Sequence, residues 1–373
     1  MNDNIKLKGK ELFYLIIATL PPLLLLFIPN YAAIYVGIDS WSIFVLIAVI
    51  DVLFNFIAVR MGMLEPDKTV IGMSRYAFGN IVGTLFGMLF VLLFAFKSLM
   101  FFRQSLEYAF MSTYTLEPIY YFAVPMIMVL IYGQFCRTKT IARINNIAFW
   151  LMVAAYFFIM LSAVRNFEIK NFMPAFADGV SPILNALPHF FTWSGNGVIL
   201  LMLFKRTEMK KGVTKYVTSA AAIAYAIVIV LNIVFIGVFG VISGFITSSV
   251  LELTMFLNSR VFFNNFDSII RLIWIFSTFS RDCIFISCTV DALSELIKLR
   301  DKKVIRVVLP VLLTVPSIIW FGNEEMYFMT AMGISSYLCA AVQYGCVLLL
   351  YIGIKIKHKE EQRVGSGKAV TVK

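Results

Sequence analysis

Ten long apolar runs constrain this 373-residue chain more than any other feature. A helix needs ~20 mainly apolar residues to cross the ~30 Å hydrocarbon core of a bilayer. Hydrophobic residues make up 60% of the chain, charged residues 14%, and the mean hydropathy is +0.87. These values lie far outside those of soluble domains. The sequence therefore predicts an all-α integral membrane protein with ten transmembrane helices, near residues 11–35, 41–59, 80–111, 118–136, 144–164, 183–205, 214–243, 266–292, 304–321 and 328–355.

The distribution of basic residues predicts how these helices are oriented. Ten spans place both termini on one side, and the loops of that side hold most of the lysines and arginines, whereas the opposite side holds Arg165, Lys170 and Arg260. Because cytoplasmic loops are enriched in these residues, we expect both termini to be cytoplasmic. The net charge of +11 then reflects orientation and contact with anionic membrane lipid, not a nucleic-acid partner. We expect a transmembrane permease-like domain over residues 1–355 and a cytoplasmic basic tail over residues 356–373.

Two of the apolar runs are interrupted by residues that disfavour helix. The first contains Leu20, Pro21 and Pro22, and the second reads TWSGNG over residues 192–197. Proline removes a backbone donor and glycine weakens the helix, and in lipid the freed backbone groups must line a cavity or find partners. Paired interruptions in two halves are typical of a transporter binding site near the membrane midplane. Since ten spans divide into five plus five, we expect an inverted repeat with broken helices 1 and 6.

The second interruption is the richer of the two in hydrogen-bonding groups. An unwound turn exposes backbone N–H groups at the start of a half-helix, where the helix dipole favours a carboxylate. The alternatives are that the small residues merely allow close helix packing, and that the first interruption is a simple proline kink. The candidate ligand-binding residues are Thr19 and Pro21 in the first interruption, and Thr192, Trp193, Ser194, Gly195 and Asn196 in the second.

The third span carries charges inside the membrane, where charge is expensive. Lys97 lies near its middle, too deep for the alkyl stem to reach the surface easily. It can meet a substrate carboxylate or an aspartate of a neighbouring helix, and we assign Lys97 and Phe101 to the ligand site. Arg103 and Glu107 are four residues apart, so we expect them to form a structural pair.

The eighth span carries a buried arginine within a polar helical face. Ser277 and Ser280 share this face with Arg281 and are candidate ligand-binding residues. Arg281 can act as an ion mimic, in the position that a sodium ion fills in related folds, or take part in coupling. The structural alternative is that it pairs with Asp282 or Asp51.

Enzymatic and metal-binding patterns are absent from the sequence. It contains no phosphate-binding glycine loop, nucleophile elbow or histidine–metal motif. The five cysteines lack metal-ligand spacing with the two histidines. We therefore expect no catalytic residue, no metal and no cofactor.

Three stretches together resemble the spore germination permease family of endospore-forming bacteria. They read PDKTVIGMSRYAFGNIVG over residues 66–83, NFMPAFADGVSPILNALPHFFTWSGNGVILLMLFKR over 171–206, and LELTMFLNSRVFFNNFDSIIRLIWIFSTFSRDCIFISCTVDALSELIKLR over 251–300. In this resemblance Gly195 matches the glycine of the sixth span, and Arg281 matches a position that is commonly lysine. Asn196 stands where the family often has glutamate, which argues against a proton-coupled role there.

The resemblance implies a fold of the amino acid–polyamine–organocation superfamily. It also implies a B-type subunit of a nutrient germinant receptor in the bacterial inner spore membrane, with A-type and C-type subunits as partners. Such a subunit binds a small-molecule nutrient, typically an amino acid, and triggers germination without transporting it in bulk. The alternative is a secondary amino-acid symporter of the same fold.

Overall fold

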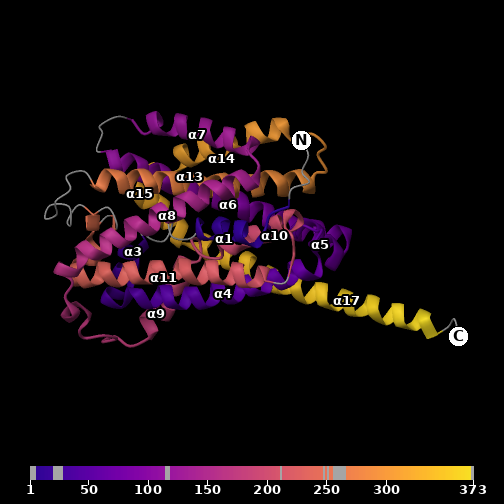
Figure 1. Ribbon diagram of the computed structural model, residues 1–373, viewed down its shortest axis with the longest axis horizontal. Coiled ribbons are helices and arrows are strands. Elements are labelled where there is room, and N and C mark those ends of the chain that lie inside the picture. The colour runs from indigo at the N-terminus through magenta and orange to yellow at the C-terminus, as the bar shows by residue number, and fades with distance from the viewer. Residues whose placement is uncertain are drawn as a thin grey trace.

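A computed structural model describes residues 6–19, 28–113, 118–210, 212–246, 248–249, 252–254 and 266–370. Over these residues the chain is a bundle of helices, and its β-type pairing is an isolated bridge between Leu7 and Thr207. The long helices run roughly lengthwise through the molecule (Figure 1). The predicted all-α architecture is confirmed.

The helices follow the apolar runs of the sequence. They are α1 (Gly9–Ile17), α3 (Ile28–Val36), α4 (Trp41–Leu64), α5 (Val70–Phe78), α6 (Asn80–Thr113), α7 (Tyr120–Phe135), α8 (Thr138–Ala163), α9 (Ser181–Ala186), α10 (Leu200–Leu203), α11 (Val213–Phe239), α13 (Phe266–Leu296), α14 (Lys303–Trp320), α15 (Glu324–Met332), α16 (Ile334–Ala340) and α17 (Val347–Val370).

Seven helical segments in the described part of the chain are long and apolar enough to cross a membrane. The three other predicted spans are the two interrupted runs and residues 118–136, where α7 is only 16 residues long. Residues 20–27, with Pro21 and Pro22, lie outside the described residues. The count of ten spans and the inverted repeat therefore stay predictions.

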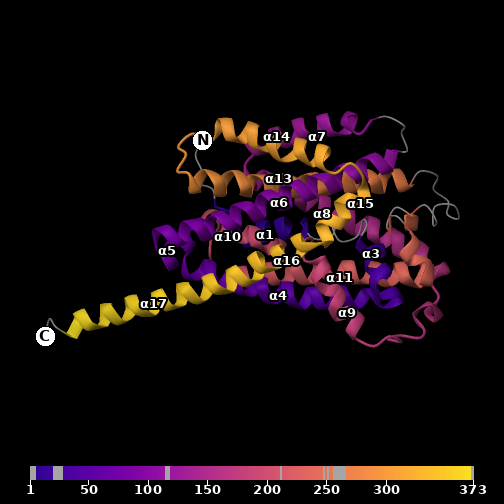
Figure 2. The same ribbon diagram turned by 180° about the vertical axis from the view of Figure 1, so that it is seen from behind.

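The interrupted runs supply the interior of the bundle. In both views α1 and α10 lie between α6 and α13 on one side and α4 and α11 on the other (Figures 1 and 2). Every residue from Val198 to Phe204 is at most 5% exposed. By contrast, Tyr132 of α7 and Ile319 of α14 are more than 70% exposed. Large apolar side chains on the periphery suit contact with lipid. Lipid offers no hydrogen-bond partners, so the polar groups of the interruption must find their partners inside the protein.

The short helix α5 is tied to both α6 and α13. Thr69 caps it by accepting the N–H of Gly72 at 3.4 Å, and donates its own hydroxyl to Glu295 of α13 at 2.7 Å. α5 packs against α6 and α17. α17 continues past residue 355 and leaves the bundle at the end where α5 lies (Figure 2). The predicted division at residue 355 thus falls inside one continuous helix.

Gly83 brings α6 directly onto the backbone of α5. A Cβ at this position would lie 2.4 Å from the carbonyl oxygen of Ser74 and 2.5 Å from the Cα of Arg75. Backbone atoms cannot swing aside, so we predict that Gly83→Ala lowers the free energy of unfolding by about 1–3 kcal/mol. The measurement is unfolding of the purified chain in mixed micelles. Gly345→Ala is the control, because nothing lies within 4 Å of that Cβ. Equal stability of the two variants would contradict this packing.

Candidate functional site

The second predicted interruption is confirmed, because helical structure stops within residues 191–195. A short 3₁₀ turn, η4 (Leu187–Phe190), precedes it, and η5 (Asn196–Ile199) restarts the helix and leads into α10. Gly195 between them has φ +66°, a conformation that favours glycine. A Cβ there would also lie 2.3 Å from Cδ of Gln343. Both the turn and the packing therefore require glycine at this position.

Two buried charged side chains hold the peptide group between Ser194 and Gly195. Lys97 of α6 donates from Nζ to the Ser194 carbonyl oxygen at 2.5 Å. The N–H of Gly195 donates to both carboxylate oxygens of Asp51 in α4, at 3.0 and 2.9 Å. Lys97 is 0% exposed and Asp51 1%. We call this arrangement the peptide clamp: each charge meets the end of the peptide dipole with the opposite sign, which is the pairing that a buried charge requires.

The Asp51 carboxylate is further held by two phenols. Tyr225 of α11 and Tyr344, from the π-helical turn η8 (Ala341–Cys346), each donate a hydroxyl to it. The hydroxyls of Ser194 and Tyr344 lie 2.9 Å apart. The carboxylate thus joins α4, α11, η8 and the interruption, and its hydrogen bonds compensate for its burial.

Asn196 connects the peptide clamp to the end of α1. Its Oδ1 accepts from Lys97 Nζ at 3.1 Å. Its Nδ2 donates to the carbonyl oxygens of Trp193 at 3.0 Å and Thr19 at 3.4 Å. Thr19 is therefore brought to the site through its backbone, while Pro21 lies outside the described residues.

Thr192 and Trp193 face α15 and α16 rather than Lys97. The Thr192 hydroxyl donates to the carbonyl oxygen of Ala331 at 2.6 Å, and its N–H donates to the Ser336 hydroxyl at 3.1 Å. The Trp193 ring is fully buried, with its centroid 6.0 Å from that of Phe328. The Trp193 side chain, a predicted ligand-binding residue, is thus packed into the protein.

Arg281 pairs with Asp282, which was one of its two predicted structural partners. Nε and Nη2 donate to Asp282 Oδ1 at 2.9 and 2.8 Å. Nη2 also donates to the Phe101 carbonyl oxygen at 3.0 Å and the Ser105 hydroxyl at 2.6 Å. The alternative pairing with Asp51 is wrong, because Asp51 is engaged in the peptide clamp.

Phe101 lies beside two buried cations, Lys97 and Arg281. Its ring centroid is 5.8 Å from Lys97 Nζ and 5.1 Å from Arg281 Cζ. An aromatic face stabilises a nearby cation. The Phe101 ring is therefore a shared neighbour of Lys97 in the peptide clamp and of Arg281. The expected pair of Arg103 and Glu107 is also confirmed.

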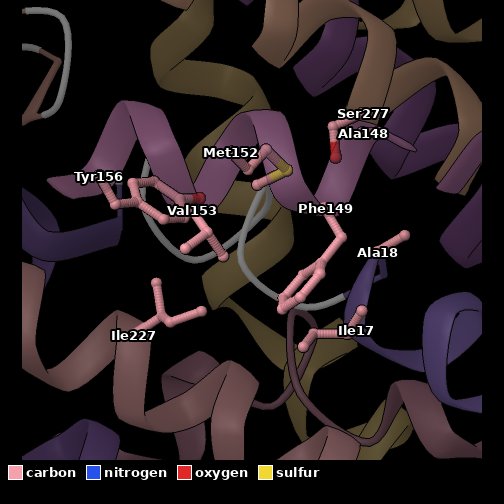
Figure 3. A pocket seen from close by; sticks show the side chains of 9 residues that line it. All are labelled: Ile17, Ala18, Ala148, Phe149, Met152, Val153, Tyr156, Ile227 and Ser277. Atoms are coloured by element: carbon pink, nitrogen blue, oxygen red, sulfur yellow. The ribbon is translucent and has the colours of Figure 1, made fainter. Parts of the chain in front are cut away.

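Ser277 and Ser280 face α8 and do not contact the peptide clamp. Ser280 donates to the side chain of Asn145. Ser277 lines a cavity of about 10 Å³ (Figure 3), with room for about one water. Tyr156 lines the same cavity, and both hydroxyls lack a hydrogen-bond partner among the described residues. Ile17 and Ala18 form its α1 side, so Ser277 adjoins the end of α1 instead.

Sequence reasoning missed Asp51 as a site residue, together with Tyr225 and Tyr344. The available signal was an aspartate inside a long apolar run, since an ionisable group at membrane depth is by default a functional candidate. The two tyrosines carried no such signal, because aromatic residues are common throughout the chain.

Among the described residues, the site consists of hydrogen-bonding groups and contains no cluster of metal ligands. The described residues contain no group of three His, Cys, Asp or Glu side chains placed to hold a metal, and the five cysteines are free. The peptide clamp offers one cation, one carboxylate and several hydroxyl and carbonyl groups, a set suited to recognising a small polar molecule.

A double-mutant cycle tests whether Asp51 and Lys97 act together. Asp51→Asn leaves the buried ammonium uncompensated, and Lys97→Met leaves the carboxylate uncompensated, so each change alone should be strongly destabilising. We predict that the double variant is more stable than the sum of the two losses by about 0.5–3 kcal/mol, measured as unfolding free energy in mixed micelles. Asp51→Asn combined with Asp178→Asn, at an exposed loop position, should be additive. Additivity in both cycles would contradict the coupling.

Comparisons with known proteins identify the family of the chain. The sequence profile of a family described as "Spore germination protein" matches residues 6–324. The chain is 24% identical over 283 residues to spore germination protein YndE of Bacillus subtilis, covering 74% of this chain and 76% of that protein.

Solved structures with a similar fold are membrane transporters. A mutant of the manganese transporter of Eremococcus coleocola superposes with a TM-score of 0.62 and 13% identity, covering 92% of this chain and 78% of that one. The same transporter in complex with an aromatic bis-isothiourea compound gives a TM-score of 0.58 at 12% identity, covering 93% and 77%. The chain shares their fold and is an integral membrane protein, and it belongs to the spore germination permease family.

Proposed function

We propose that the chain is the B-type subunit of a nutrient germinant receptor, and that it detects an amino acid at the peptide clamp. The observation that carries the proposal is the pairing of buried Lys97 and Asp51 across one peptide group of a broken helix. The family and the transporter fold support a membrane protein of germination whose interior can bind a small solute.

A zwitterion complements this pair of charges. An α-amino acid carries a carboxylate and an ammonium group separated by one carbon atom. Its carboxylate would accept from Lys97 and from the N–H of Gly195, while its ammonium group would donate to Asp51 and to the Ser194 carbonyl oxygen. Each buried charge then keeps an opposite partner, so the site remains neutral whether ligand is bound or absent.

Ligand binding at this N–H requires a rearrangement, because the Gly195 N–H already donates to the Asp51 carboxylate. Moving Asp51 also disturbs its bonds to Tyr225 and Tyr344, and so changes how α4, α11 and η8 are held together. A ligand shifts a conformational equilibrium only by its difference in affinity for the two states. Here the difference in affinity arises because the hydrogen bond from Gly195 to Asp51 is replaced by one from Gly195 to the ligand carboxylate.

The receptor role also requires partners that read this change. We expect A-type and C-type subunits, in the inner spore membrane, with both termini of this chain on the spore-core side. The basic helix α17 projects from the bundle at the same end as α5, which supports a common side for the basic segments (Figure 1).

The second candidate function is secondary transport of an amino acid. The fold shared with manganese transporters supports it. Manganese itself is a weaker candidate, since the described residues offer no cluster of three suitable ligands. Uptake of labelled amino acids by the purified chain in liposomes separates the two: robust uptake without partner subunits supports the transporter and contradicts the receptor.

Filling the interruption should abolish nutrient sensing. Ser194 is fully buried against Tyr344, so we predict that Ser194→Leu eliminates the nutrient response of spores that carry it as their only copy. Tyr344→Phe removes only hydroxyl bonds to Ser194 and Asp51, and should raise the nutrient concentration needed about tenfold. Germination is followed as the loss of optical density, with protein levels measured by immunoblot.

Gly345→Ala is the matched control, one residue beyond Tyr344 and with open space around its Cβ. Its response should equal that of the parent. Normal germination with both Ser194→Leu and Tyr344→Phe would place the ligand site elsewhere.

The charge of Arg281 should matter more than its shape. Lysine preserves the cation beside Asp282, whereas alanine leaves a fully buried carboxylate unpaired, a loss that typically costs about 3–5 kcal/mol. We predict that Arg281→Lys retains most of the germination response and that Arg281→Ala loses it. Equal phenotypes at equal protein levels would refute this role.

A further inference from the structure

An open cavity of about 390 Å³ lies away from the peptide clamp, between α3, the start of α15 and residues 244–246. We call it the outer cavity. Both α3 and α15 lie toward the end of the bundle opposite the projecting α17 (Figure 2). It shares no lining residue with the peptide clamp. The lining residues are Asn30, Tyr31, Ile34, Gly244, Phe245, Ile246, Asn323, Glu324 and Glu325.

The charged side chains that the described residues contribute to the outer cavity are all acidic. Glu324 and Glu325 line it, and no lysine or arginine among the described residues does. Arg103 of α6 acts electrostatically on Glu324, and it is already paired with Glu107. Two carboxylates at one cavity, with no lining cation among the described residues, favour binding of a positively charged ligand.

A buried amide supplies a second, independent sign of a ligand. Asn30 is 5% exposed, and its backbone N–H donates to the Ser249 hydroxyl at 3.2 Å. Its side-chain Oδ1 has no hydrogen-bond partner among the described residues, and Asn30 lines the outer cavity. A buried unpaired acceptor is costly, so a donor from a ligand would satisfy it.

The remaining wall is apolar and aromatic. Tyr31, Ile34 and Phe245 line it. The Tyr31 ring stacks on Phe328 with centroids 4.0 Å apart, and Phe328 in turn packs on Trp193 of the interruption. An occupant of the outer cavity would therefore contact an aromatic series that ends at the ligand site proposed above.

We propose that the outer cavity binds a primary ammonium group, with Glu324 and Glu325 as its counter-ions and Asn30 Oδ1 as a hydrogen-bond acceptor. The three donors of an ammonium group match these acceptors. The cavity volume and its apolar wall suit an amine with an organic body better than a bare metal ion, and the described residues supply no third acidic, histidine or cysteine ligand there. The amine can belong to a free small molecule or to a lipid headgroup. This inference goes beyond the receptor function and does not depend on it.

The pH dependence of binding follows from Glu324. Burial, and secondarily the neighbouring Glu107 carboxylate, raise the pKa of Glu324 to about 7, and Arg103 opposes the shift. The other groups that face it are Glu325 on α15 and the Tyr31 phenol on α3. An acid with a raised pKa is charged only above that value, whereas an alkylammonium group stays charged throughout this range. Affinity for the amine should therefore rise from pH 6 to pH 8.

The test is thermal unfolding of the purified full chain in detergent with added phenethylammonium, and with 2-phenylethanol as the neutral counterpart. A ligand that binds only the folded state raises the melting temperature. We expect a rise with the ammonium compound alone. The variant Glu324→Gln/Glu325→Gln should bind about tenfold more weakly, and Glu324→Gln alone should lose the rise in affinity from pH 6 to pH 8.

Glu168→Gln/Asp178→Asn is the matched control, because it removes two exposed carboxylates from residues that do not line the cavity. It should bind like the parent. Should the double glutamine variant not fold, Glu325→Gln alone, at an exposed position, carries the same prediction. Three results would overturn the proposal. The first is an equal rise in melting temperature with 2-phenylethanol, and the second is an equal loss of phenethylammonium binding in the control variant. The third is a glutamate-dependent rise in melting temperature with calcium but not with the amine.

Nanodiscs distinguish the two sources of the amine. If a lipid headgroup fills the cavity, phosphatidylethanolamine nanodiscs should suppress the effect of phenethylammonium relative to phosphatidylglycerol nanodiscs. If the natural ligand is soluble, the effect should be the same in both. Either result supports the ammonium site, and absence of the effect in detergent and in both lipids contradicts it.

Discussion

A single peptide group in the middle of the bundle carries the main constraint on this fold. Breaking a helix inside a membrane frees backbone donors and acceptors that lipid cannot satisfy. In this protein the carbonyl of Ser194 is satisfied by the Lys97 ammonium and the N–H of Gly195 by the Asp51 carboxylate. The break therefore requires two buried charges. The charges in turn require the break, since neither has a direct ion-pair partner among the described residues.

Much of the surrounding packing follows from this arrangement. Asp51 draws in hydroxyls from α11 and η8, and Asn196 joins Lys97 to the end of α1. Gly195 and Gly197 lack a Cβ where Gln343 and Asn55 approach within 2.3 and 1.8 Å of its ideal position. Helices far apart in sequence thus meet at one polar centre inside an apolar bundle. Changes at that centre reach several helices at once, which is the property that a sensor needs.

The sequence predicted the fold through strong local signals and the site through weaker ones. Apolar runs specify membrane helices directly, and the letters TWSGNG located the interruption because glycine and serine oppose helix. Lys97 stood out because its charge is deep in an apolar run. Its partners did not, because contacts between Lys97, Ser194 and Asp51 depend on how helices pack, which local spacing does not encode. For Arg281 the sequence left two aspartates open, and geometry selected the adjacent Asp282. Ser277 and Ser280 share a helical face with it, yet α8 packs against them.

The central claim is that a nutrient displaces Asp51 from the N–H of Gly195, and the resonance of that amide reports it most directly. Labelling serine carbonyl carbon and glycine nitrogen selects the three Ser–Gly peptides of the chain, which end at Gly195, Gly244 and Gly367. Each of the twenty common amino acids is added in turn to the labelled protein in nanodiscs. The account predicts that one or a few of them shift the Gly195 resonance, and that Lys97→Met abolishes this response. A Gly195 resonance that stays fixed while a nutrient binds the protein would contradict it.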